Sequence, residues 1–199
     1  MKRIMLTSIL VVSVFLYTTG QNSYSKKDIT HISKITVYGI DFSNAVVINE
    51  SYKHKDMLEG QLYNAINDRF FIEKLDQLRR GLGKEFEINS SLTNKKNSQS
   101  TVNYFVIDTN SINKIIKEYE LVEKDGIGLV FIVKSLDKPY KKVELYTVFF
   151  DIGTKRAIWF KKETGRGGRW TGLENYWCNK VFNAVDGFID SYGHEFERK

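Results

Sequence analysis

Three segments in the C-terminal half of the chain are rich in β-branched and aromatic residues and are separated only by short turns. They span residues 127–133, 143–152 and 155–160, with Lys138-Pro139 and Gly153-Thr154 in the turns between them. Residues of these types favour β-strands. Because connections this short join antiparallel neighbours, the sequence predicts an antiparallel meander of strands.

An amphipathic segment follows the meander. Its apolar residues recur at intervals of three and four: Trp170, Leu173, Trp177, Val181, Val185, Phe188 and Tyr192. This spacing places them on one stripe of a helix, which must be buried against the sheet. Large aromatic residues on such a stripe supply buried area, so we interpret the two tryptophans as core residues and not as a ligand platform. We expect Cys178, beside the stripe, to be an unreactive thiol.

The N-terminal half alternates between strand and helix patterns. Residues 35–42 have the profile of a strand, and residues 57–82 repeat apolar residues at helical spacing, with a shift of the stripe at Phe70-Phe71 that predicts a change of direction. Residues 89–99 are almost wholly polar and predict an exposed loop. A buried strand is expected at 102–107, followed by a helix that Asp108 or Thr109 caps.

These patterns together predict an α/β fold. We expect two layers: a mixed sheet of about five strands, with the antiparallel meander at its C-terminal side and with helices packed mostly on one face. The reason is that each predicted helix has a single apolar stripe to bury. The composition is typical of a globular protein, since 42% of the residues are hydrophobic and 27% are charged.

The first twenty residues have the layout of a secretory signal peptide. Lys2 and Arg3 precede an apolar run over residues 4–17, and Thr18-Thr19-Gly20 supplies the small residues of a cleavage site. This apolar run is too short to cross roughly 30 Å of hydrocarbon. We therefore expect a signal peptide at 1–20, a polar leader at 21–33 and a single globular α/β domain at 34–199.

The exported chain is expected to be soluble, in the periplasm or at the cell surface. No cysteine lies near the cleavage site to carry a lipid anchor, and the single Cys178 has no partner for a disulfide within the chain. No membrane span is predicted after cleavage. Loss of the two N-terminal cations lowers the net charge from +6 to +4, an excess too small to indicate nucleic-acid binding.

A search for catalytic, cofactor and metal motifs finds none that fits. His31, His54 and His194 are far apart in the sequence, so a histidine metal site is not expected. Nucleophile elbows and phosphate-binding loops are absent. One enzyme hypothesis stays open, an exported hydrolase using Asp41 and Asp151, because each ends a predicted strand and the two could converge at one edge of the sheet. The alternative is that both residues form turns.

Residues 155–169 concentrate positive charge. Lys155, Arg156, Lys161, Lys162, Arg166 and Arg169 stand there against a single acid, Glu163. The segment runs from a strand through a loop with three glycines into the start of the last helix, where unpaired N–H groups attract anions. We expect a binding surface made of Lys161, Lys162, Arg166, Gly167, Gly168 and Arg169. The alternative is a loop whose charges are only solvated.

Two patterns resemble known families. The hairpin at residues 143–160, with Asp151 before its turn, resembles that of the curli-secretion and penicillin-binding-protein-activator family of periplasmic domains, and the strand at 35–42 is similar to that family's opening strand. Residues 149–152 and 165–177 resemble secreted domains of unknown function from Gram-negative bacteria. The first resemblance implies a non-enzymatic envelope protein that docks onto or assembles with other proteins.

The expected function is therefore that of an exported, non-catalytic envelope protein. It would serve as a binding or assembly module for an anionic or acidic partner, either an envelope protein or an anionic glycan or phosphate ligand. No cofactor is expected. The exported hydrolase with paired carboxylates is the alternative.

Overall fold

The computed structural model describes residues 23–48, 61–98, 107–167 and 172–196. The predicted signal peptide, most of the expected strand at 102–107 and Trp170 lie outside these residues. The elements are α1 (Lys26–His31), β1 (Lys34–Asp41), β2 (Val46–Ile48), α3 (Tyr63–Glu73), α4 (Leu75–Leu82), β3 (Glu85–Ile88), α5 (Ser91–Ser98), α6 (Thr109–Lys117), β4 (Ile127–Asp137), β5 (Lys142–Asp151), β6 (Arg156–Arg166) and α7 (Leu173–Phe196).

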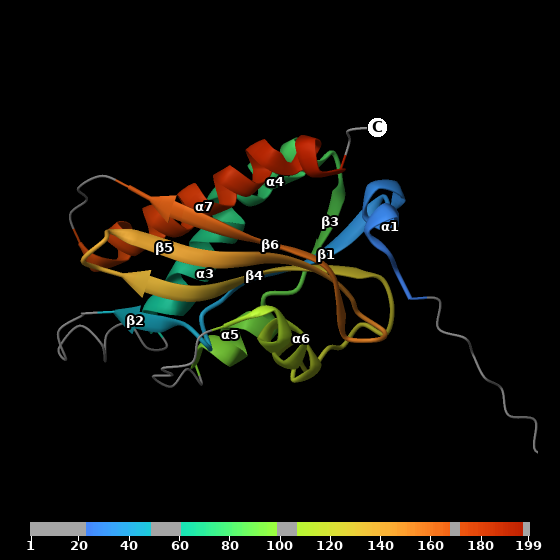
Figure 1. The fold of residues 1–199 in the computed structure, drawn as a ribbon, viewed down its shortest axis with the longest axis horizontal. Helices are drawn as coiled ribbons and strands as arrows, with labels where there is room; N and C mark the ends of the chain where they lie inside the picture. The colour runs from blue at the N-terminus through green and yellow to red at the C-terminus, as the bar shows by residue number, and fades with distance from the viewer. Residues whose placement is uncertain (1–22, 49–60, 99–106, 168–171, 197–199) are drawn as a thin grey trace, which may run out of the picture.

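The strands form one mixed sheet in the order β3-β1-β4-β5-β6, and the short β2 pairs with the far end of β4 (Figure 1). Strand β1 is parallel to both β3 and β4. Strands β4, β5 and β6 are antiparallel to one another in turn. The predicted α/β fold, with a mixed sheet and an antiparallel meander at its C-terminal side, is confirmed.

Helices α3, α4 and α7 cover one face of the sheet, which we call the first face (Figure 1). Phe131 of β4 lies between Phe70 of α3 and Phe188 of α7, with ring centroids 5.4 and 6.1 Å away. Trp177, Val181 and Phe188 are fully buried, as the stripe predicted. Each such side chain contributes about 1.5–3 kcal/mol by leaving water, so this core holds α7 on the sheet.

The second face carries a smaller core beneath α6, to which Val130 and Phe150 contribute from the strands. Helix α6 begins where the sequence predicted, because the side chain of Asp108 accepts a hydrogen bond of 2.8 Å from the backbone N–H of Ser111. This bond satisfies one of the free N–H groups of the first helical turn. Helices α1, α3, α4 and α7 contribute to the first-face core, and α5 and α6 contribute to the second-face core, so most of the described helices are on one face, in agreement with the prediction.

The sequence predicted two helical segments within residues 57–82, and the structure has two, α3 and α4, but the predicted position of the break at Phe70-Phe71 is wrong. Helix α3 continues through both residues to Glu73, and the break falls at Lys74. Both phenylalanines pack against the first-face core, so the shifted stripe marks a wide contact and not a bend. The N-terminal part of this helical prediction, residues 57–60, lies outside the described residues.

The exposed loop predicted at 89–99 is also wrong, because Ser91–Ser98 form helix α5. Asn97 of this helix is fully buried. Its side chain accepts a hydrogen bond of 2.7 Å from the N–H of Phe42 and donates one of 3.1 Å to the carbonyl of Ile40. Strand β3 pairs with β1 only as far as Val37, so α5, together with Asn67 of α3, which accepts a hydrogen bond of 2.7 Å from the N–H of Ile40, supplies partners to the rest of this β1 edge.

Three further elements were not predicted from the sequence: β2, β3 and α1. Strand β3 is short and largely exposed, which leaves it without a clear pattern. Helix α1 lies within the polar leader at 21–33, where Ile29 is fully buried. The backbone N–H of Tyr24 donates a hydrogen bond of 3.0 Å to Asp151 at the end of β5. This segment therefore packs on the domain.

Strand β6 and helix α7 approach each other very closely at Gly165. A Cβ atom at this position would collide with the backbone carbonyl of Lys180 and would lie 2.7 Å from the backbone nitrogen of Ala184. Backbone atoms cannot rotate aside as the end of a flexible side chain can. The absence of a side chain at Gly165 therefore allows α7 to pack on β6.

We expect Gly165→Ala to lower the free energy of unfolding by about 2–3 kcal/mol, the upper part of the range for an overpacked interior. Urea denaturation followed by circular dichroism measures this change. Gly187→Ala is the matched control in the same interface, because its added Cβ would meet only Glu163, at 3.7 Å. The control lies inside a helix and is expected to gain up to about 1 kcal/mol. Equal stability of the two variants would contradict the close approach.

Candidate binding surface

The side chains of β5 and β6 alternate between the two faces of the sheet. Val143 and Leu145 are buried in the first-face core, so their neighbours on β5 face the other way. Those neighbours are Lys142, Glu144 and Tyr146, and the register places Arg166, Thr164 and Lys162 of β6 directly opposite them. The second face of the sheet is therefore polar at this end.

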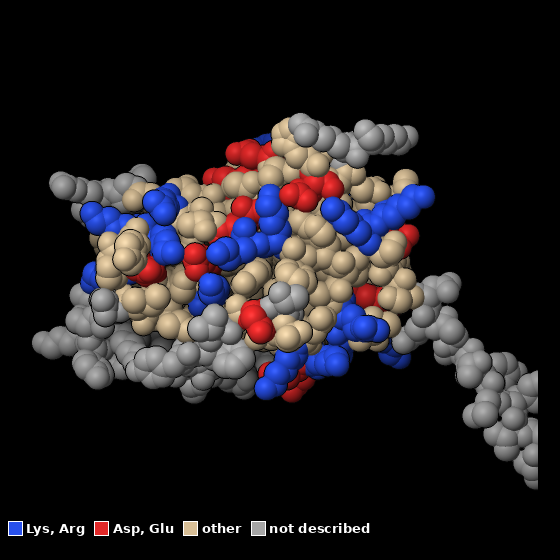
Figure 2. Space-filling model, viewed as in Figure 1, with Lys and Arg blue, Asp and Glu red and all other residues tan. Residues whose placement is uncertain are grey.

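Three lysines converge on the carboxylate of Glu144. The Nζ atoms of Lys134, Lys142 and Lys162 lie 3.2, 3.1 and 3.7 Å from its oxygens. Lys134 comes from β4, at a bulge where the register against β5 shifts, and bulges redirect side chains in this way. We call Lys134, Lys142, Glu144, Lys162 and Arg166 the basic face. In Figure 2, lysine and arginine side chains lie at the left, over the end of the sheet where β5 begins and β6 ends, and others are spread over the middle and right of the same view.

The basic face carries more positive than negative charge. Partial burial acts to raise the pKa of Glu144, but hydrogen bonds from Lys142 and Lys134 outweigh it and hold this pKa below the ordinary value. Glu144 is therefore ionised at neutral pH and balances only one of the cations. Arg166 is exposed and has no ion pair with any residue that the structure describes. Like charges held this close repel one another.

Aromatic rings border the basic face. Tyr146 and Phe160 meet edge to face, with ring centroids 6.3 Å apart. Tyr140, in the turn between β4 and β5, is 75% exposed, and the Nζ of Lys142 lies 5.9 Å from its ring centroid. A ligand seated on this surface would meet flat apolar borders beside the cations, where aromatic groups contribute strongly to binding.

The structure brings together only part of the surface that the sequence predicted. Lys162 lies on the basic face, whereas Lys161 points to the first face. There it pairs with Glu195 at 3.2 Å and with Glu163 at 3.4 Å. Adjacent residues of a strand point to opposite faces, so Lys161 and Lys162 cannot serve one site.

The glycine loop was predicted to approach a ligand, but its described part contacts α7. Gly167 lies against Asn183, whose side chain donates a hydrogen bond to the carbonyl of Arg166. Gly168 and Arg169 lie outside the described residues. Sequence reasoning missed Lys134 and Lys142 because they belong to other strands, and only the register of β4, β5 and β6 brings them to Glu144.

Asp41 and Asp151 do not form a pair. Asp41 lies beside Ile132 on β4, and Asp151 lies opposite Ile127. These two positions of β4 are about 16 Å apart along the strand. Asp41 instead accepts a hydrogen bond of 2.6 Å from the buried hydroxyl of Tyr119, and Asp151 accepts one of 2.9 Å from the turn that follows it. The arrangement gives no support to a hydrolase with paired carboxylates.

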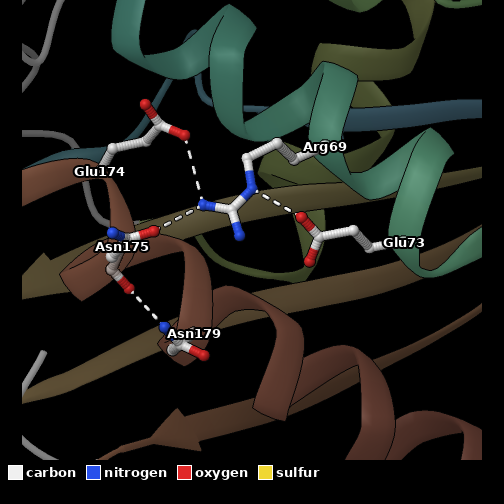
Figure 3. A network of polar contacts seen from close by, with 5 residues as sticks. All are labelled: Arg69, Glu73, Glu174, Asn175 and Asn179. Carbon is white, nitrogen blue, oxygen red and sulfur yellow. Dashed lines mark hydrogen bonds and ion pairs between the residues drawn. The ribbon is translucent and has the colours of Figure 1, made fainter.

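A second polar cluster joins α3 to the start of α7 (Figure 3). Arg69 donates hydrogen bonds to Glu73 at 2.8 Å, to Glu174 at 3.2 Å and to Asn175 at 2.9 Å. These acids raise the pKa of Arg69, so its charge is permanent. The guanidinium is used in this contact between the helices. We therefore interpret the cluster as structural.

The only cysteine, Cys178, is fully buried. Burial raises the pKa of its thiol to about 12. The thiolate is the reactive form of cysteine, so this side chain is unreactive at neutral pH, as the sequence predicted.

Searches for other kinds of site return nothing in the described ranges. No group of three or more histidine, cysteine or acidic side chains there is arranged to hold a metal ion. Among the helices of the described residues, none is both long and apolar enough to cross a membrane.

Comparison with protein-family models, curated proteins and solved structures found no match to this chain. The function must therefore be inferred from the chemistry of the basic face.

Lys180 of α7 is fully buried, and no carboxylate of the described residues pairs with it. Its Nζ donates a hydrogen bond of 3.1 Å to the carbonyl of Tyr176 and lies 3.3 Å from the centroid of that ring. Burial lowers the pKa of Lys180, and the positive charge of Lys141 adds to this effect. The protonated form of Lys180 therefore costs folding free energy.

We expect Lys180→Met to raise the free energy of unfolding at about pH 7. The folded-state pKa lies below the unfolded one, so the penalty is fully present below the folded pKa and fades as the pH rises towards about 10. The advantage of the variant should therefore shrink as the pH rises through the lowered pKa of Lys180 towards the ordinary lysine value of about 10, as measured by urea denaturation. Lys117→Met, at an exposed position of α6, is the control and should show no such trend. A Lys180→Met variant less stable than the wild type throughout would contradict this account.

Proposed function

We propose that this protein is an exported, non-catalytic binding module whose basic face holds an acidic group of a partner. The observation that carries the proposal is the convergence of Lys134, Lys142 and Lys162 on the single carboxylate of Glu144. Asp137 lies opposite Lys142 in the register, so two carboxylates stand against three ammonium groups and the neighbouring Arg166, and positive charge remains in excess. An anion that docks here relieves their mutual repulsion.

The geometry of the basic face favours a partner with several negative charges. Lys142 and Arg166 are directly opposite in the register, and Lys162 is four residues from Arg166 along β6. Four residues of a strand span about 13 Å. A single small anion cannot reach both ends of this span. A flexible or extended acidic partner can, and the guanidinium of Arg166 can grip a carboxylate with two parallel hydrogen bonds.

The place of action is part of the proposal. The signal-peptide pattern of residues 1–20 supports export to the periplasm or cell surface. The resemblance of the 143–160 hairpin to periplasmic assembly domains supports a protein of the cell envelope as the partner. An anionic glycan is the other chemistry that would suit these cations. The separation of Asp41 from Asp151 leaves no support for the hydrolase alternative.

Neutralising the basic face should abolish this binding. We expect the triple variant Lys142→Gln, Lys162→Gln and Arg166→Gln to bind immobilised polyglutamate at least about tenfold more weakly than the wild type, since each exposed ion pair is worth up to about 1 kcal/mol. Surface plasmon resonance at low and physiological salt measures the affinity. Binding by the wild type should weaken with salt, because exposed charges are screened within about 8 Å at physiological ionic strength.

The control has the same change of net charge at another place. Lys114, Lys117 and Lys124 are exposed and lie on α6 and in the loop after it. Their joint replacement by Gln should leave the affinity within about twofold of the wild type. Circular dichroism verifies that both triple variants are folded. Equal losses in the two variants would mean that only net charge matters, and the proposed site would then be wrong.

Removing the acid of the basic face should have the opposite effect. Glu144 competes with an external carboxylate for the same lysines, so we expect Glu144→Gln to bind polyglutamate roughly threefold more tightly, the effect of one charge about 6 Å away in water. The same binding assay measures this gain. Weaker binding by Glu144→Gln would mean that Glu144 holds the lysines in position, and that they are a structural cluster.

A further inference from the structure

Strand β6 is an edge of the sheet. In the described part of the chain it pairs with β5 and with no other strand. Strand β6 is eleven residues long. At its ends, the N–H of Ala157 is bonded to Asn113 of α6 and the carbonyl of Arg166 to Asn183 of α7, so a further strand would pair with the backbone groups between these two residues. Such an edge is a template for the addition of a further strand.

Helix α7 lies under β6 and not across its edge. The side chains of Trp159, Lys161 and Glu163 all point towards this helix: Trp159 contacts Phe188, Lys161 donates a hydrogen bond to Ser191, and Glu163 lies beside Gly187. Gly165 continues the same series. Because alternate residues of a strand share a face, α7 covers the first face of β6 along its length. The residues between them, including Lys162 and Thr164, are exposed on the second face.

The charge of β6 disfavours a second copy of this chain as the neighbouring strand. The strand carries Arg156, Lys161, Lys162 and Arg166 against the single acid Glu163. Two copies paired edge to edge would bring these like charges onto one seam, and lysines on an edge are a known protection against self-pairing. The complementary neighbour is a strand that carries acids.

We propose that the partner is an extended acidic polypeptide segment that adds to the sheet as a strand along the edge of β6. This proposal rests on the function proposed above and specifies its partner. Main-chain hydrogen bonds to β6 provide affinity, and the alternate side chains provide specificity. Acids at every second position of the segment lie on the second face, beside Lys162 and Arg166.

The register of β6 predicts the sequence pattern of the segment. Lys162, Thr164 and Arg166 point to the second face at successive intervals of two residues. On the first face Lys161 is already paired with Glu195 and Glu163. An acid on that side of the segment would therefore have to compete with these two carboxylates for Lys161. The segment therefore alternates acidic residues on one face with uncharged residues on the other.

Three peptides of eight residues separate strand addition from simple charge attraction. The first alternates Glu and Val. The second has the same composition in the order Glu-Glu-Val-Val, which divides its acids between both faces of a strand. The third is the alternating peptide with every backbone nitrogen methylated, which removes the N–H donors along both edges while keeping the charge. Fluorescence anisotropy with the full chain measures all three affinities, and the triple Gln variant of the basic face serves as the control protein.

The alternating peptide should bind at least about tenfold more tightly than each of the other two, because both lose several main-chain or side-chain contacts. Its affinity should fall in the triple Gln variant.

Three other outcomes would contradict the proposal. Equal affinities of the three peptides for the wild type, with weaker binding of all three to the triple variant, would overturn strand addition and leave the binding module in place. Affinity that is the same in the wild type and the triple variant would overturn both proposals. If the protein dimerises and the dimer excludes the peptide, a second copy of the chain is the strand that occupies the edge of β6. This result would also overturn the proposal of an acidic segment as the partner.

Discussion

Helix α7 lies along the first face of the antiparallel meander, and this packing decides the orientation of the charged residues in the C-terminal half. The interface buries Trp177, Val181 and Phe188, and at Gly165 the backbones of the two elements are in close contact. Because α7 covers one face of β5 and β6, every second residue of these strands points to the other face. The hydrophobic core therefore positions a polar surface on the opposite side of the same strands.

This alternation separates residues that are neighbours in the sequence. Lys161 pairs with acids beneath the sheet, whereas Lys162 joins the lysines around Glu144. The same geometry gathers residues that are far apart in the chain, since Lys134 reaches Glu144 from β4. The cations of segment 155–169 are thus divided between the two faces of the sheet. The cations that do come together belong to three different strands. The basic face is a property of the sheet and not of the segment 155–169.

Several polar residues that could suggest a site are used in holding the fold together. Asn97 supplies hydrogen bonds to the edge of β1 where β3 ends, and Arg69 ties α3 to α7. Buried polar groups need such partners because an unpaired one costs free energy. The residues of the basic face differ from Asn97 and Arg69. The basic face has more cations than acids, and some of these cations are exposed to solvent. That imbalance distinguishes a binding surface from internal structure.

The elements with strong periodicity could be predicted from local patterns: the strand β1, the meander of β4, β5 and β6, the cap of α6 at Asp108 and the buried stripe of α7. These are local patterns, in which spacing alone shows which side chains are buried. Three features could be seen only once the chain was folded: α5 is a helix with a buried side, Asp41 and Asp151 lie apart, and Lys134 and Lys142 join Lys162. Each of these depends on the order and register of strands, which bring together residues distant in the chain. The spacing within one segment carries no information about that pairing, because it is set by the shared core on which all the segments pack.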